Sequence, residues 1–217
     1  MSKKNRTLLD LQDNIDRDFA WRIKELSLLK SKIPNTPNRD PLQDVLIRAG
    51  VTMLYAHWEG FVKCAAENYL NYVSLKRLRH DELESCFVAL CLKKKINEMD
   101  NTNRFDLQTA AVDFMLEQLN ERAYIPYEGI IQTKSNLSFF VFRDICTVIG
   151  IDYKKYQLKE TLIDRELLQF RNSIAHGKYL SMNFNEYLKI YDKIIEMMRD
   201  IKDDILNAAA TEKFKRS

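Results

Sequence analysis

The residues of this chain best suited to proton transfer and phosphate binding lie together at positions 170–177, Phe-Arg-Asn-Ser-Ile-Ala-His-Gly. His176 has an ordinary pKa of about 6.5, which suits proton transfer at neutral pH. On a helix, Asn172 shares a face with His176 because the two are four residues apart. Arg171 lies about 140° away around the axis, but its long side chain can swing to the same rim. A cation, an amide and a titratable ring at one helix end can hold a phosphate and move a proton beside it.

Apolar residues at helical spacing precede this segment and predict a helix from Leu162 to His176. Gly177 can supply the left-handed residue that ends it. His176 is then on the last turn, where the partial negative charge of the helix end favours the imidazolium. The alternative interpretation is structural: the histidine caps the helix for stability, and Arg171 lies on a solvated face.

Three stretches of the chain resemble a known family. Residues 162–177 are similar to the motif of HEPN-superfamily ribonucleases, in which an Arg is followed by a polar residue and, four to six positions after the Arg, by a His. Residues 55–63 (Tyr-Ala-His-Trp-Glu-Gly-Phe-Val-Lys) resemble its small bacterial MAE-type, RiboL-PSP-like branch. So does Ser135-Asn136-Leu137, which precedes an amphipathic helix that ends at Gly150. Ser135 or Asn136 is expected to cap that helix.

The resemblance implies a metal-independent endoribonuclease without a cofactor, whose RNA substrate supplies the 2′-OH nucleophile. We expect His176 to transfer the proton, Arg171 to hold the phosphate and stabilise its growing charge, and Asn172 to orient either of them. One His and one Arg are too few for separate acid and base roles. The family resolves this by forming homodimers that pool both motifs in one cleft, which a two-fold axis permits.

Three further residues are expected near the substrate: Lys178 and Tyr179 after the motif, and Glu59. Glu59 follows His57 as His-x-Glu, but the deaminase chemistry of that pattern needs a Pro-Cys-x-x-Cys, which is absent. We therefore interpret Glu59 as a buried acceptor near the Arg171 end of the motif helix. In one HEPN subset the motif is Arg-x4-His-x-Tyr and the tyrosine is modified. Position 178 here is Lys, which argues against that control.

The resemblance also implies a biological role as a toxin or anti-phage effector, restrained by an antitoxin or inhibitor protein. Two alternatives stay open. Some HEPN domains are non-catalytic helical modules that bind nucleotide, RNA or a protein partner, and the chain could equally be a structural subunit of a larger defence complex.

The predicted fold is all-α: a HEPN-like helical bundle built on long antiparallel helices with a short motif helix. Five Gly and four Pro in 217 residues favour helices over turns. We expect a single domain over residues 1–217, with an N-terminal helix in 7–35, a helical core over 41–210 and a frayed tail at 211–217. Asp40, Pro41 and Gln43 predict a capped helix start. The long helices 41–76 and 184–208 are expected to run antiparallel and frame the motif helix.

Composition limits the other possibilities. A net charge of +3 is mild, so RNA binding must come from a local patch, for which residues 93–95 (Lys-Lys-Lys) are the densest cationic spot. The four cysteines form no Cys-x-x-Cys pair, so no metal site is expected and the thiols should be free. No apolar run reaches the roughly 18 residues of a membrane span. We expect a cytoplasmic protein without a membrane partner.

Overall fold

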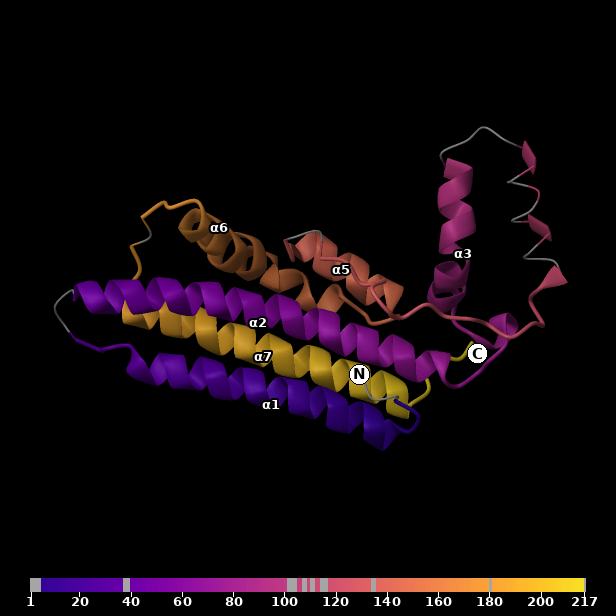
Figure 1. The fold of residues 1–217 in the computed structure, drawn as a ribbon, viewed down its shortest axis with the longest axis horizontal. Coiled ribbons are helices and arrows are strands. Elements are labelled where there is room, and N and C mark those ends of the chain that lie inside the picture. Colours follow the sequence, from indigo (N-terminus) through magenta and orange to yellow (C-terminus); the bar gives the residue numbers. More distant parts are fainter. Residues whose placement is uncertain are drawn as a thin grey trace.

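Three long helices lie side by side and form the body of the molecule (Figure 1): α1 (Leu8–Lys32), α2 (Pro41–Ser74) and α7 (Phe184–Ala210). The computed structural model describes residues 5–36, 40–100, 105, 106, 109, 112, 113, 117–133, 136–179 and 181–216, the side chains of 94–100 excepted. The described residues contain no strand, only two isolated bridges between extended residues. The prediction of an all-α fold is confirmed for the described residues.

Local capping chemistry determines where these helices begin. Thr7 and Asp10 form a reciprocal capping box at the start of α1. The Asp40 carboxylate accepts from the backbone N–H of Leu42 at 2.9 Å, with a proline at the first helical position. Gln43 does not take the expected capping-box role, because its amide nitrogen donates to the Pro34 carbonyl at 2.5 Å instead.

α1 runs antiparallel to the other two long helices. The hydroxyls of Ser27, near its end, and Tyr191, near the start of α7, are 3.2 Å apart. At the other end of α1, Asp16 is paired with Lys202 at 2.9 Å. The expectation of long antiparallel helices therefore holds for α1.

α2 and α7 run parallel, so the expectation that 41–76 and 184–208 are antiparallel is wrong. Tyr187 packs against Gly50, which places the two helix starts together. At the far end, the rings of Tyr72 and Phe214 are 6.0 Å apart. The reason is the connection between them, because the motif helix carries the chain back to the α2 start before α7 begins.

That connection covers one face of the bundle (Figure 1). It contains α5 (Phe139–Val148), a 3₁₀ helix (Lys154–Lys159), a π-helix (Leu162–Leu168) and α6 (Gln169–Ala175). The π-helix and α6 form one continuous motif helix antiparallel to α7, since Lys159 pairs with Glu196 at 3.7 Å and Lys193 with Glu166 at 4.0 Å. A regular α-helix was expected from Leu162. Residues 162–168 instead form a π-helix, which has more residues per turn. Their side chains therefore point in different directions around the axis from those that a regular α-helix would give.

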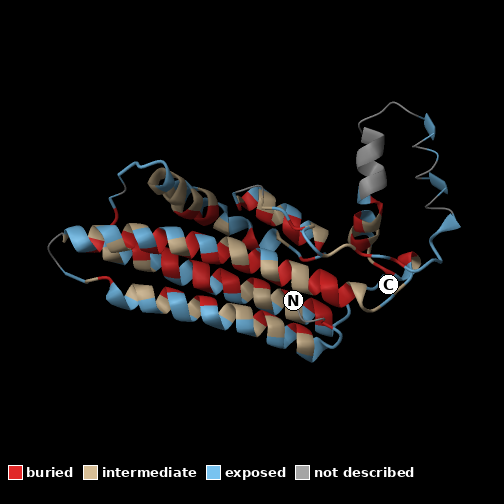
Figure 2. Ribbon diagram, in the orientation of Figure 1, coloured by how far each residue is buried: buried red, intermediate tan, exposed pale blue. Residues whose placement is uncertain are grey.

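The core follows α2, which is buried over most of its length (Figure 2). Trp58, Phe61 and Tyr69 are among its largest fully buried side chains. Gly50 and Gly60 allow side chains of neighbouring helices to pack against the α2 backbone. A Cβ at Gly50 would lie 2.8 Å from the Tyr187 hydroxyl of α7, and a Cβ at Gly60 would lie 2.6 Å from Arg22 Nη1 of α1. Within the described part of the chain, no helix has the length and apolar character to cross a membrane.

α3 (Ser85–Asp100) projects from the end of the bundle, with the C-terminus near its base (Figure 1). The tail is docked there rather than frayed. Phe214 is 0% exposed, its carbonyl accepts from Glu84 N–H at 2.9 Å, and Arg216 N–H donates to Glu82 O at 3.0 Å. The expected frayed tail at 211–217 is therefore wrong for 211–216, and Ser217 lies outside the described residues.

Candidate active site

The motif helix ends at Ala175, one residue before the predicted end, and His176 is its C-cap. Gly177 adopts φ +71°, and its N–H donates to Ile174 O at 3.0 Å. The Lys178 N–H donates to Ser173 O at 2.8 Å. These two bonds are those of a Schellman ending, which needs a left-handed residue at the glycine position. His176 is thereby held at the helix end with its side chain exposed to solvent.

His176, Asn172 and Lys178 share one open cavity of about 380 Å³ on the flank of the motif helix. Its lining residues are Asp164, Leu168, Gln169, Asn172, Ser173, His176 and Lys178. The structure therefore brings together the imidazole of His176 and the amide of Asn172, with the ammonium of Lys178 in the same cavity. Such a combination can receive the ribose and phosphate groups of a polynucleotide.

Arg171 faces α2 instead and does not line this cavity. Its guanidinium carbon lies 4.0 Å from the centroid of the Tyr55 ring, a cation–π contact. Its Nη2 donates to the Asn136 side-chain oxygen at 2.7 Å. Within the chain the angular separation of Arg171 and His176 is thus retained, and the two lie on different sides of the helix.

A network below Arg171 fixes its position. The buried Tyr55 hydroxyl accepts from the Leu137 N–H at 2.6 Å. Burial raises the pKa of Tyr55, an effect that the bond from Leu137 opposes. One helical turn along α2, Glu59 accepts from the Thr133 hydroxyl. Thr133 and Leu137 are thus each bonded to α2, and Asn136, next to Leu137, holds Arg171.

Sequence reasoning missed two members of this network. Asn136 was expected to cap the next helix, but the cap is Ser138, whose hydroxyl accepts from Val141 N–H at 3.3 Å. The Asn136 amide is therefore available to Arg171. Tyr55 lies in the 55–63 stretch, but no contact with Arg171 was expected for it. Both residues lie in stretches that resemble the HEPN family, and that resemblance was the signal that could have identified them.

The other three predicted residues, Glu59, Lys178 and Tyr179, lie in different places, and Asp164 is a further lining residue of the His176 cavity. Glu59 was expected to be a buried acceptor near Arg171; it is half-buried, and its carboxylate accepts from the Thr133 hydroxyl. Lys178 lines the His176 cavity. Tyr179 turns toward α2, where its hydroxyl donates to Asp44 at 2.8 Å. Asp164 accepts from Phe139 N–H at 2.7 Å and so joins the π-helix to α5.

Other expected features lie away from this site. Lys93 is exposed on α3 and lines a separate groove against α5, while the side chains of Lys94 and Lys95 lie outside the described residues. The four cysteines are free, and burial raises the pKa of Cys146 to about 12, which disfavours a nucleophilic thiolate. Among the described side chains, no group of three or more His, Cys, Asp or Glu is placed to hold a metal.

Comparison with known proteins gives one family assignment. No curated protein and no solved structure matches the chain at a significant level. The family model RiboL-PSP-HEPN matches residues 17–207, which include the motif helix, the Tyr55 and Glu59 turns of α2 and the Asn136 segment. The chain therefore belongs to the HEPN family of the RiboL-PSP type, and this membership indicates a nuclease or RNA-related role.

Proposed function

We propose that this HEPN protein is a metal-independent endoribonuclease that cleaves RNA by attack of the 2′-OH. The observation that carries the proposal is the exposed imidazole of His176, held at a helix end in one open cavity with Asn172 and Lys178. A base removes the 2′-OH proton, and that oxygen attacks the adjacent phosphorus. The bond to the 5′-oxygen breaks and this oxygen takes a proton, which leaves a 2′,3′-cyclic phosphate.

Arg171 suits the task of stabilising the phosphorane charge. Stacking on Tyr55 and the bond to Asn136 restrict its guanidinium to one orientation. A cation that is already oriented loses little entropy when it meets a charge that develops in the transition state. A planar guanidinium can also donate two parallel hydrogen bonds to two phosphate oxygens, a geometry that the single nitrogen of lysine does not provide.

The active unit is proposed to be a homodimer. In one protomer, Arg171 and His176 lie on different sides of the motif helix, so a single copy does not join them in one cavity. Two motif helices facing each other across a two-fold axis would pool two of each residue in a common cleft. The cleavage rate per chain should therefore rise as the protein concentration passes through the dimer dissociation constant and level off only well above it.

A cleavage assay in EDTA tests the proposal directly. The wild-type protein should cut labelled total RNA into fragments that end in 2′,3′-cyclic phosphate. His176→Ala should abolish cutting while the helical circular dichroism and the dimer mass stay unchanged. The exposed Gln157→Ala should remain active as a matched control. Full cleavage by His176→Ala would end the assignment.

The Arg171 series adds a second readout. Arg171→Ala should lose cleavage as His176→Ala does, and Arg171→Lys should restore little of it, because one ammonium does not replace the planar fork. The exposed Lys189→Ala removes a cation from α7 and should leave the rate unchanged. Equal activity of Arg171→Lys and wild type would contradict the proposed contact with two oxygens.

The biological proposal is a toxin or anti-phage effector that an antitoxin or inhibitor protein restrains. Induced expression in a bacterial host should arrest its growth only when His176 and Arg171 are both intact.

The alternative is a non-catalytic HEPN module that binds nucleotide, RNA or a protein partner. The separation of Arg171 from His176 in one protomer favours it, because a cation can hold phosphate without cutting. RNA that binds and is recovered uncut in the EDTA assay would support this alternative.

A further inference from the structure

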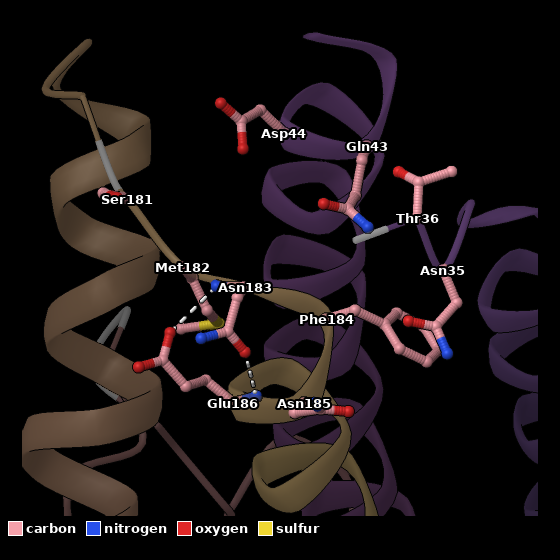
Figure 3. A pocket seen from close by; sticks show the side chains of 10 residues that line it. All are labelled: Asn35, Thr36, Gln43, Asp44, Ser181, Met182, Asn183, Phe184, Asn185 and Glu186. Carbon is pink, nitrogen blue, oxygen red and sulfur yellow. Dashed lines mark hydrogen bonds between the residues drawn. The ribbon is translucent and has the colours of Figure 1, made fainter. Parts of the chain in front are cut away.

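Arg48 places a second guanidinium on the side of α2 that contacts the motif helix. Around the α2 axis, Arg48 lies about 40° from Asp44 and about 20° from Tyr55, at 3.6 residues per turn. The Tyr55 ring lies 4.0 Å from the Arg171 guanidinium, and Asp44 accepts from the Tyr179 hydroxyl at 2.8 Å. The Asp44 carboxylate projects from α2 on the side of the motif helix (Figure 3). Arg48 therefore lies on α2 between two points at which the end of the motif helix and the residues after it are attached.

The Arg48 guanidinium is half-buried and has no partner within the described part of the chain. Its Nε is fully buried and makes no hydrogen bond. The two terminal nitrogens make no hydrogen bond, ion pair or ring contact with a described residue, and unlike Nε they are not buried. The guanidinium thus keeps one edge inside the protein and offers its two terminal nitrogens to solvent.

The carboxylates of α2 do not neutralise this cation. Asp44, one turn before Arg48, accepts from Tyr179 and forms no ion pair with Arg48. Glu59, the next carboxylate along α2, is 11 residues further on and accepts from the Thr133 hydroxyl. A partly desolvated charge without a counter-charge costs free energy. An anion that reaches the two terminal nitrogens of Arg48 should therefore bind with a gain.

The geometry around Arg48 suits a phosphate of a nucleic acid strand. Two terminal nitrogens of one planar guanidinium match two oxygens of a phosphate group. Arg48 and Tyr55 are seven residues apart, which is about 10.5 Å along the helix axis. A stacked strand covers that length in about three nucleotides, at 3.4 Å each. Arg48 and Arg171, which lies on Tyr55, can therefore hold two phosphates of the same strand.

We propose that Arg48 binds a non-scissile phosphodiester of the RNA strand, a few nucleotides from the phosphate that Arg171 holds. The inference rests on the proposed function, because it extends the RNA path of the same site. A phosphate contact positions the strand and does not read its sequence. Arg48 therefore contributes to the affinity for RNA of any sequence, and it takes no part in the chemical step.

Binding of 2′-O-methyl RNA tests the inference without cleavage, because the attacking hydroxyl is blocked. Dissociation constants of labelled A and U octamers are measured from about 50 to 200 mM salt. Arg48→Met keeps most of the apolar stem and removes the charge. It should raise both constants at least about fivefold and reduce the slope of log affinity against log salt by about 0.7, the value for one phosphate on a single strand. Arg199→Met, at an exposed arginine of α7, should change neither quantity.

Two further variants separate charge, geometry and folding. Arg48→Lys should keep the salt slope within about 0.2 of the wild-type value, and it should raise the dissociation constant at least about twofold because one nitrogen does not provide two parallel bonds. Arg48→Met should melt at the wild-type temperature or above it, since it removes a charge without a partner. If it melts lower, Arg48→Gln replaces it with the same expected change of slope. A lower melting temperature in both variants would show a structural partner of Arg48 and overturn the inference.

The outcomes distinguish this inference from the nuclease proposal. Wild-type affinity and slope in Arg48→Met overturn the inference whether or not the protein cuts RNA. An Arg48-dependent affinity in a protein that does not cleave supports the inference and removes the nuclease proposal. In a protein that cleaves, Arg48→Met should raise KM and keep kcat, and a loss of kcat at unchanged KM would overturn the assignment to a non-scissile phosphate. Tighter binding of inorganic phosphate or AMP than of the octamers overturns the assignment to RNA.

Discussion

Tyr55 and Tyr187 allow a matched test of the network beneath the motif helix. Both tyrosines are buried, at 4% and 0% exposure. The Tyr55 hydroxyl accepts from the Leu137 N–H at 2.6 Å, while the Tyr187 hydroxyl has no hydrogen-bond partner among the described residues and packs against Gly50. Tyr55→Phe therefore removes a hydroxyl that makes a hydrogen bond, whereas Tyr187→Phe removes a hydroxyl without a partner among the described residues.

The two expected magnitudes follow from this difference. Tyr55→Phe leaves the N–H of Leu137, a residue that is 0% exposed, without its acceptor, which costs about 1–3 kcal/mol. The ring stays, so the contact with Arg171 is kept. The Tyr187 hydroxyl loses its contact with water on folding and gains no hydrogen bond in return. Its removal in Tyr187→Phe should therefore leave the free energy of unfolding within about 0.5 kcal/mol of the wild-type value or raise it.

Urea unfolding followed by circular dichroism measures both variants. The midpoint for Tyr55→Phe should fall with the slope unchanged, because the surface exposed on unfolding is the same. A chain of this size should lose roughly 2–4 °C of melting temperature per kcal/mol. Equal losses for the two variants, or a loss below about 0.5 kcal/mol for Tyr55→Phe, would refute the assigned hydrogen bond.

Three further predictions concern other contacts. Gly60→Ala would place a Cβ 2.6 Å from Arg22 Nη1, so the guanidinium must move away from its two bonds to Asp18. Because alanine favours the helix over glycine by about 1 kcal/mol, a free energy of unfolding that does not rise in urea indicates this close contact, and a rise of about 1 kcal/mol would exclude it. Burial lowers the pKa of His57 below 6.5, so its contribution to stability is present above pH 6.5 and is lost as the pH falls through the lowered folded pKa. The urea midpoint should drop between pH 7.5 and 5 and drop less in His57→Gln. Asn136→Ala should slow RNA cleavage about tenfold, equivalent to about 1.4 kcal/mol, with the dimer mass unchanged, since Arg171 keeps its ring contact but loses its hydrogen bond; a wild-type rate would remove Asn136 from the site.

Features that depend on neighbouring residues could be predicted from the sequence. The start of α2 at Asp40 and of α7 at Asn183 follows from side chains that cap the backbone two or three positions later. The end of the motif helix at Gly177 follows from the left-handed conformation that glycine adopts without strain. His176 and Asn172 share a cavity because four residues make about one helical turn.

Features that depend on distant segments required the tertiary structure. The direction of α7 relative to α2 is decided by where the intervening chain packs, and capping signals carry no information about it. The tail is docked because Phe214 fills a space between elements far from it in sequence. The orientation of Arg171 is set by Tyr55 and Asn136, which precede it by 116 and 35 positions and meet it only after the bundle has formed. Local chemistry thus determined which residues can act, and packing alone decided which of them meet.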